Sequence, residues 1–310
     1  MASGEKLKDR LPQLGICKTL HGLNIQDLNM VPSKFGQVPF GSVLSYQCPP
    51  ETSRDIINHP ACLDFPQLPV DGYRYTHAPP PGFQPTDQQQ CHLESLQVSR
   101  VLSAEIEKET RQQSGCKLWK EVRAPRITAS RFREVCFVRG GATSKTLLAR
   151  MLKGGIQTAA MKKGLEQEEE ILRRYADCFD VSVTQCGFII HPDAPHLGAS
   201  PDGKVYDPLG TPPFGLAEVK SCFVEDLTHV TYLHTINGKF TLKKSHKYFY
   251  QVQGQLAVSG LQWCDFITDT INDYAVERIY RDEEIILSMR EKLDNFFFYI
   301  YMDMFLNRKA

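Results

Sequence analysis

The order of helical and extended patterns in the second half of the chain most constrains its fold. Apolar residues at helical spacing predict a long helix over residues 158–179. Short apolar segments bounded by turn-forming residues then indicate strands, with helices between and after them. The expected strands cover 181–190, 203–206, 215–222, 262–270 and 273–280, and the further helices cover 248–259 and 282–306. This order predicts an α/β (α+β) fold in which a mixed central sheet is flanked by helices.

The first part of the chain has a different composition. Proline is dense between Pro49 and Pro85, with glycine and glutamine between the prolines. Such a composition favours extended, turn-rich backbone over packed helices. A helical pattern begins at about Leu93. We therefore predict a proline-rich arm or partial N-terminal region over residues 1–92, of unassigned function, and a separate domain over residues 93–310.

Two short motifs place candidate catalytic residues on neighbouring extended segments. The segment Gly198–Gly203 reads Gly-Ala-Ser-Pro-Asp-Gly and puts Asp202 in a turn, in which Gly203 is expected to take a positive φ. The triplet Glu218-Val219-Lys220 lies on a predicted strand, so Glu218 and Lys220 project from one face. Two carboxylates can bind Mg²⁺, and a lysine beside them can orient a water. Taken singly, the motifs also fit a turn residue and a solvated ion pair.

The charge distribution suggests a polyanionic partner. Lysine plus arginine equals aspartate plus glutamate, with 36 of each, so the net charge is zero. However, residues 135–165 and 227–264 contain basic residues and no acidic ones, and they flank the two motifs in sequence. This arrangement suits a metal-binding centre that a polyanion must reach. Each tract by itself is also compatible with an ordinary solvated surface.

The cysteines and the chain start indicate an intracellular protein. The ten cysteines include no CxxC pair, and residues 1–10 are polar and charged. Reduced thiols in a nuclear or cytoplasmic protein are therefore expected, without a signal peptide. Charged residues within 282–306 argue against a transmembrane segment there. A zinc site formed by Cys48, Cys62, Cys91 and His92 is an alternative that their spacing does not require.

Five motifs in order resemble a known family. They are Arg123 with Ile127-Thr128-Ala129-Ser130, Gly164 with Glu168, Ser200-Pro201-Asp202-Gly203, Glu218-x-Lys220, and a Gln-x-Gln pattern that includes Gln253. Together they resemble the YqaJ-type viral recombinase family, which contains the lambda-type and alkaline exonucleases of the PD-(D/E)xK nuclease superfamily. The resemblance covers residues 122–280 and implies a restriction-endonuclease-like core.

The resemblance implies a metal-dependent nuclease site. Asp202, Glu218 and the backbone carbonyl of Val219 would bind Mg²⁺ or Mn²⁺, and Glu168 would bind a second metal or its water. Lys220 would position and polarise the attacking water. Gln253 would lie near the nucleophile and the cleaved phosphate.

The resemblance also implies a site for a DNA end. Arg123 and Ser130 match the pair that grips a terminal 5′-phosphate in processive exonucleases, and Ser130 is expected to cap the following helix. Arg126 adds a further cation in the phosphate-binding group, with no assigned contact. The inserted segment 207–213 departs from compact relatives and is expected only to lengthen a hairpin.

These features predict a metal-dependent DNA nuclease, and most directly a 5′-to-3′ exonuclease acting on duplex ends in recombination or repair. One alternative is a structure-specific or restriction-like endonuclease. A second is a non-catalytic nucleic-acid-binding module that keeps the nuclease fold. The family also includes homo-oligomers, although no residue in this sequence identifies one.

Overall fold

The computed structural model describes residues 30–33, 36–39, 55–57, 65–153 and 159–307. The chain divides into two compact units, Met1–Arg54 and Asp55–Ala310. In the first unit, strands β1 (Met30–Ser33) and β2 (Gly36–Pro39) pair antiparallel. The other described elements belong to the second unit.

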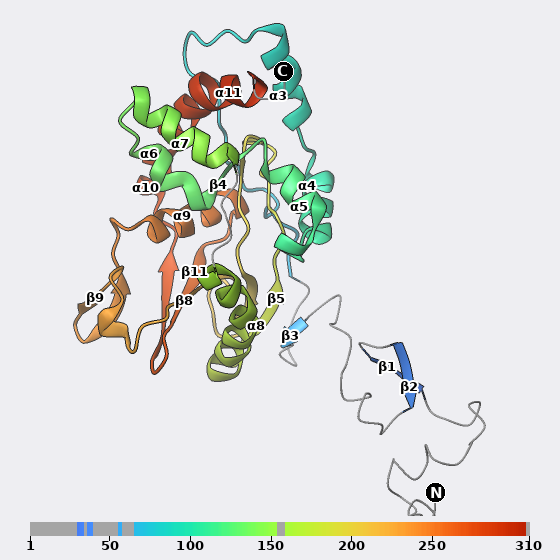
Figure 1. Cartoon of the computed structure of the whole chain (residues 1–310), viewed down its shortest axis with the longest axis vertical. Coiled ribbons are helices and arrows are strands. Elements are labelled where there is room, and N and C mark those ends of the chain that lie inside the picture. The colour runs from blue at the N-terminus through green and yellow to red at the C-terminus, as the bar shows by residue number, and fades with distance from the viewer. Residues whose placement is uncertain (1–29, 34–35, 40–54, 58–64, 154–158, 308–310) are drawn as a thin grey trace, which may run out of the picture. The chain divides into compact units, whose positions relative to one another are not determined.

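A six-stranded mixed sheet forms the centre of the second unit (Figure 1). Its order is β12–β11–β8–β7–β5–β3, in which only the β8–β11 pair is parallel. The strands are β3 (Asp55–Ile57), β5 (Ser182–Gln185), β7 (Gly203–Tyr206), β8 (Phe214–Ser221), β11 (Trp263–Asp269) and β12 (Tyr274–Tyr280). The inserted segment 207–213 joins β7 to β8, which pair as an antiparallel hairpin. The predicted mixed sheet is therefore confirmed.

Alternate side chains of β8 face two helical layers. Ala217 and Val219 pack in an apolar cluster with Ile171 of helix α8 (Ala159–Phe179). Leu216 packs in a second cluster with Val252 of helix α9 (Lys247–Ser259). Helix α9 lies between β8 and β11 in sequence, as the crossover of a parallel pair requires. Since residues two apart share a strand face, Glu218 projects on the side of α9.

The strand predicted over 181–190 is shorter in the structure. Strand β5 ends at Gln185, because the next residues pack closely against helix α4 (Arg100–Glu109). A Cβ at Gly187 would lie 1.8 Å from the backbone oxygen of Glu107. The N–H of Gly187 donates to the Glu107 carboxylate at 3.0 Å instead of to a neighbouring strand. Gly187 therefore allows the backbone to approach α4 closely, and the strand ends before it.

Short helices precede α8 in the chain. The pattern starting at about Leu93 corresponds to two helices, α3 (Asp87–Leu96) and α4, and α3 runs across the domain boundary expected at residue 93. Leu68 and Tyr75, inside the proline-rich region, are buried in the main apolar core. The following elements are α5 (Lys117–Arg123), β4 (Ile127–Thr128), the 3₁₀ helix η4 (Ala129–Arg131), α6 (Phe132–Cys136) and α7 (Gly141–Lys153). Strand β4 pairs in parallel with β6 (Leu197–Gly198).

Two further features complete the unit. Strands β9 (Leu233–Ile236) and β10 (Lys239–Leu242) form a separate antiparallel pair. The helix predicted over 282–306 is interrupted by a π-helical segment, η6 (Phe297–Tyr301), between α10 (Glu283–Phe296) and α11 (Met302–Asn307). The extra residue in a π turn rotates the helix that follows, and Phe297, Phe298 and Tyr301 are all buried. In the part of the chain that the structure describes, no helix has the length and apolarity needed to cross a membrane.

Candidate active site

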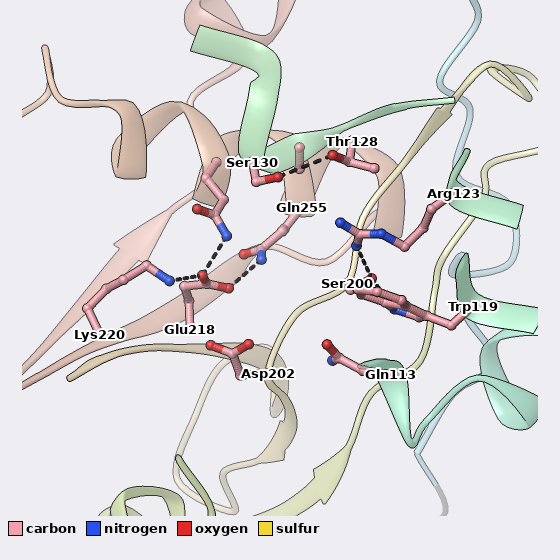
Figure 2. Close-up of a pocket in the computed structure, with 12 residues that line it drawn as sticks. Gln113, Trp119, Arg123, Thr128, Ser130, Ser200, Asp202, Glu218, Lys220 and Gln255 are labelled. Carbon is pink, nitrogen blue, oxygen red and sulfur yellow. Dashed lines mark hydrogen bonds and ion pairs between the residues drawn. The ribbon is translucent and has the colours of Figure 1, made fainter. Parts of the chain in front are cut away.

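The two acidic motifs meet in a cavity of about 210 Å³ (Figure 2). Asp202, Glu218 and Lys220 line it, together with Arg123 and Ser130. Asp202 comes from the start of β7, Glu218 and Lys220 come from β8, and Arg123 ends α5. The fold thus gathers most of the predicted site residues from well-separated parts of the sequence.

Asp202 is held beside the middle of β8 by two hydrogen bonds. Its backbone N–H donates to the oxygen of Ala217 at 3.1 Å, and its Oδ2 accepts from the N–H of Val219 at 2.7 Å. Gly203 does not have the positive φ that the turn was expected to need. It is the first residue of β7, and a Cβ there would lie 2.9 Å from the Val183 side chain. Glycine is therefore required for close strand packing.

Glu218 is buried, with 1% of its surface exposed. Its Oε1 accepts from Gln251 Nε2 and its Oε2 accepts from Gln255 Nε2, both at 2.5 Å. Its Oε1 also accepts from the Lys220 ammonium. Because Gln251 and Gln255 are one turn apart on α9, a single helix face fixes both carboxylate oxygens.

Gln253 does not lie at the cavity, which contradicts its predicted place near the nucleophile. Its Nε2 donates to the backbone oxygen of Tyr280 at 2.9 Å, and its Oε1 accepts from the N–H of Asp282 at 2.8 Å. A residue two positions from Gln251 points to a different side of a helix. Gln253 therefore joins α9 to the end of β12, and Gln251 and Gln255 face the acidic residues.

Glu168 on α8 reaches the same acidic centre. Burial, and then the charge of Glu218, raises the pKa of Glu168 to about 7, although Lys220 opposes this. Burial and the charges of Glu168 and Glu218 likewise raise the pKa of Asp202 well above its ordinary value. The charge of Glu218 thus disfavours the ionised forms of both Glu168 and Asp202.

The donor set suits a hard divalent cation. Asp202, Glu218 and Glu168 offer carboxylate oxygens, and the Val219 carbonyl can add a backbone oxygen. The Lys220 ammonium contacts the Glu218 carboxylate and lies 3.0 Å from the Val219 oxygen. The position between these two oxygen ligands therefore attracts a positive charge. The predicted ligands fit Mg²⁺ or Mn²⁺, which prefer oxygen donors and retain bound water.

The other side of the cavity carries a partly buried arginine. Arg123 stacks on the ring of Trp119, with 3.8 Å between the guanidinium carbon and the ring centroid. Its Nη1 and the indole N–H of Trp119 both donate to the Ser200 hydroxyl at 3.0 Å. Burial, and then the charge of Arg131, lowers the pKa of Arg123 to about 10, so it remains charged at neutral pH. Within the described ranges, no carboxylate is paired with this guanidinium.

Ser130 also lines the cavity, but it does not cap a helix as expected. It lies inside η4, and neither Thr128 nor Arg131 forms a side-chain cap at the helices that follow. The hydroxyls of Thr128 and Ser130 instead lie 3.1 Å apart within hydrogen-bonding reach. They present two polar groups to the cavity opposite Arg123 (Figure 2).

Arg126 is a structural residue, which corrects its placement in the phosphate-binding group. Its guanidinium donates to the backbone oxygens of Pro195, Val122 and Leu96 at 2.7, 2.7 and 3.0 Å. It is buried, with 7% of its surface exposed, and does not line the cavity. Its donors therefore hold three loop or helix-end carbonyls together and are not available to DNA.

Four cavity residues were missed in the sequence: Gln113, Trp119, Gln251 and Gln255. Trp119 and Arg123 lie at helical spacing, which was an available signal. Gln113 has a positive φ of 43° and donates to the oxygens of Pro201 and Cys186 at 2.9 and 3.0 Å. It therefore anchors the backbone next to Asp202, and no local sequence pattern indicates this contact. Of the alternative zinc ligands, Cys48 and Cys62 lie outside the described residues.

Comparisons with known proteins identify a family to which part of the chain is similar. Residues 118–262 match the family model for the YqaJ-like viral recombinase domain. The resemblance found in the ordered motifs is therefore confirmed over this part of the chain. Within it, Asp202 directly precedes β7, and Glu218 and Lys220 lie on the adjacent β8.

Several solved structures are also similar. An alkaline exonuclease from Laribacter hongkongensis is 29% identical, with 63% of this chain and 96% of that chain covered and a TM-score of 0.47. A SOX–DNA complex is 13% identical, with 71% and 73% covered and a TM-score of 0.46. The shutoff and exonuclease protein from Kaposi's sarcoma-associated herpesvirus is 14% identical, with 72% and 75% covered and a TM-score of 0.40. A comparison with curated proteins gives no match.

Proposed function

We propose that this protein is a metal-dependent deoxyribonuclease, and that it degrades duplex DNA from 5′ ends during recombination or repair. One observation carries the proposal: a single cavity holds an acidic centre with a lysine on one side and, on the other, a partly buried arginine that has no carboxylate partner among the described residues. The acidic centre suits a metal and the scissile phosphate, and the arginine suits a second, terminal phosphate.

Each side chain of the acidic centre has a distinct task. Asp202, Glu218, Glu168 and the Val219 carbonyl would hold Mg²⁺ or Mn²⁺. When bound, the ion lowers the pKa of a coordinated water and neutralises charge that develops on the phosphate. Gln251 and Gln255 keep the Glu218 carboxylate in one orientation, with each amide donating to a different oxygen.

Lys220 orients the attacking water and does not act as a base. Burial alone would lower the pKa of its ammonium, but the charges of Glu218 and Asp202 raise that pKa above its ordinary value. The ammonium therefore stays protonated at the pH of the cell and can only donate hydrogen bonds. It can hold a water oxygen or stabilise negative charge on the phosphate.

The arginine side of the cavity favours an exonuclease. A partly buried, charged guanidinium is stabilised when an anion pairs with it. The planar face of Arg123 is fixed by Trp119, and Ser130 and Ser200 lie in the same cavity, so a terminal phosphate dianion would meet donors from several directions. An internal phosphodiester carries one charge and is flanked by nucleotides on both sides, so it fits such a closed end less well.

The test is digestion of duplex DNA by the purified full chain. Linear and closed circular DNA of the same sequence are incubated with and without Mg²⁺, and the linear DNA carries either a 5′-phosphate or a 5′-hydroxyl. We expect Mg²⁺-dependent release of nucleotides from linear DNA, fastest with the 5′-phosphate, and intact circles. Asp202→Asn and Glu218→Gln should abolish the release.

Other outcomes separate the alternatives. Cleavage of closed circles would identify an endonuclease. DNA binding without metal-dependent cleavage of either substrate would identify a non-catalytic module. Full activity of Asp202→Asn would refute the assignment of the acidic centre.

A further inference from the structure

A second cluster of ligand-type side chains lies apart from the cavity. Its members are His77, His196 and Asp294, which come from the segment before α3, the loop before β6 and helix α10. None of them lines the active-site cavity. Their ligand atoms all lie within 4.8 Å of one another.

The three side chains converge on one point. Nδ1 of His77 and Nε2 of His196 lie 2.5 and 2.9 Å from the same oxygen, Oδ1 of Asp294. Tetrahedral Zn²⁺ would keep such atoms about 3.3 Å apart, given bonds of about 2.0–2.1 Å. Shifts of less than about 1 Å would therefore admit the ion without any change of backbone.

The three side chains are shielded from bulk solvent, and two polar atoms beside them have no hydrogen-bond partner among the described residues. The side chains of His77, His196 and Asp294 are only 1%, 4% and 10% exposed. His77 Nε2 and the Tyr75 hydroxyl are buried and have no hydrogen-bond partner within the described ranges. The rings of Tyr75 and His77 are in contact, with centroids 4.3 Å apart. When Nδ1 of His77 binds a metal, it must lose its proton. The unpaired Nε2 of the same ring can then carry that proton.

The chemistry of the donors selects the ion. Two imidazoles and one carboxylate are ligands typical of Zn²⁺, whereas Mg²⁺ prefers oxygen ligands. The cluster has a donor set different from that of the acidic centre, so one solution of mixed metals can load each site with a different ion.

We propose that His77, His196 and Asp294 form a structural Zn²⁺ site. The site fastens the segment around His77 to α10 and to the loop that leads into β6. That loop also supplies the Pro195 oxygen to Arg126, so the ion supports the scaffold on which the cavity residues Arg123 and Ser130 are carried. A water would complete the tetrahedron, and the Tyr75 hydroxyl, on a ring that contacts the His77 ring, has no hydrogen-bond partner among the described residues.

The experiment measures zinc on the full chain without a histidine tag. Protein carrying Asp202→Asn and Glu218→Gln is used, so that the acidic centre does not contribute. After equilibration with Zn²⁺ and removal of free ion, we expect about one zinc per chain by mass spectrometry of metals. Zn²⁺ should also raise the Tm above that in EDTA, because it binds the folded state. The same chain loaded with Co²⁺ should show the visible absorption of a tetrahedral nitrogen and oxygen site.

Substitutions in the same background locate the ion. His77→Gln and His196→Gln should each weaken zinc binding by at least about 10-fold. His191→Gln is the matched control, since His191 is a buried histidine in contact with Tyr75 but outside the cluster, and it should retain zinc. Circular dichroism in EDTA verifies that each variant is folded.

Two results would overturn the proposal. The first is the absence of retained zinc and of any zinc-dependent change in Tm in the background protein, which needs no cluster variant. The second is undiminished zinc binding in folded His77→Gln and His196→Gln. In either case the cluster is a hydrogen-bonded contact in which Asp294 accepts from two histidines.

Discussion

Gln255 on helix α9 donates its side-chain N–H to Oε2 of Glu218 on strand β8, at 2.5 Å. The bond joins the crossover helix to the central strand at the acidic centre. Gln251 makes the equivalent bond to Oε1. The packing of α9 on the sheet therefore orients the carboxylate that is predicted to bind metal.

Replacing these glutamines should impair catalysis. Gln255→Ala or Gln251→Ala leaves one oxygen of Glu218 without its amide donor. Loss of a hydrogen bond that orients a metal ligand typically lowers metal affinity or activity by about 10- to 100-fold. We expect a loss of that size in kcat or in the apparent Mg²⁺ affinity, measured by DNA digestion over a Mg²⁺ series.

Gln253→Ala is the matched control on the same helix. It should mainly lower the free energy of unfolding, by about 1–3 kcal/mol. A larger catalytic loss in Gln253→Ala than in Gln255→Ala would contradict this arrangement.

Metal binding should strengthen as the pH rises toward neutrality. The pKa of Glu168 is raised to about 7 by burial and by the charge of Glu218, so below that pH the metal-free protein carries a proton that the ion must displace. The apparent affinity for Mg²⁺ should therefore increase with pH up to about 7 and then level off. Isothermal titration calorimetry between pH 5.5 and 8.5, in buffers of different ionisation enthalpy, measures both the affinity and the protons released.

Glu168→Gln tests the origin of that pH dependence. The amide cannot ionise, and the loss of its charge also removes one of the influences that raise the pKa of Asp202. We expect a flatter affinity profile below pH 7 and fewer protons released on binding. An unchanged profile would show that another group titrates.

Lys220→Met should lower kcat and spare binding. The substitution keeps most of the side-chain volume but removes the ammonium that orients the water, and a loss of about 100- to 1,000-fold is expected. Metal affinity should be maintained or improved, since the ammonium no longer competes for the Glu218 carboxylate and the Val219 oxygen. Single-turnover kinetics at saturating DNA and Mg²⁺ separate the two effects. If Lys220→Met instead lost DNA or metal binding at an unchanged single-turnover rate, the role given to the ammonium would be wrong.

Arg123→Ala should act mainly on phosphorylated ends. Removing the guanidinium should reduce kcat/KM on 5′-phosphorylated duplexes by about 10- to 100-fold, with a smaller effect on 5′-hydroxyl ends. Arg150→Ala is a matched loss of one positive charge, because Arg150 is exposed and pairs with Glu134. It should affect both kinds of end equally and only slightly. Equal losses on both ends in Arg123→Ala would favour an endonuclease.

Much of the site follows from local sequence. The segment expected over 203–206 is a strand with the same bounds. The strand expected over 215–222 is shifted by one residue from β8, and the helix expected over 248–259 starts one residue later than α9. Strand periodicity alone places Glu218 and Lys220 on one face. The order of the motifs also placed Asp202, Glu168, Arg123 and Ser130 among the site residues, and Asp202, Arg123 and Ser130 line one cavity with Glu218.

Other residues depend on contacts that no local pattern encodes. Three glutamines alternate along α9, and only the way this helix rests on β8 decides that Gln251 and Gln255 face Glu218, while Gln253 faces Tyr280 and Asp282. Arg123 and Arg126 are similarly close in sequence. One points into the cavity, and the other donates to three backbone oxygens.

The sequence by itself determined the alternation of helices and strands and the chemical identity of the acidic centre, because both depend on periodicity and spacing within short segments. The tertiary structure alone decided which amides hold Glu218, which arginine remains available to a phosphate, and that His77, His196 and Asp294 meet. The physical reason is that burial and hydrogen-bond pairing depend on residues far apart in the chain, and these are in contact only once the helices pack on the sheet.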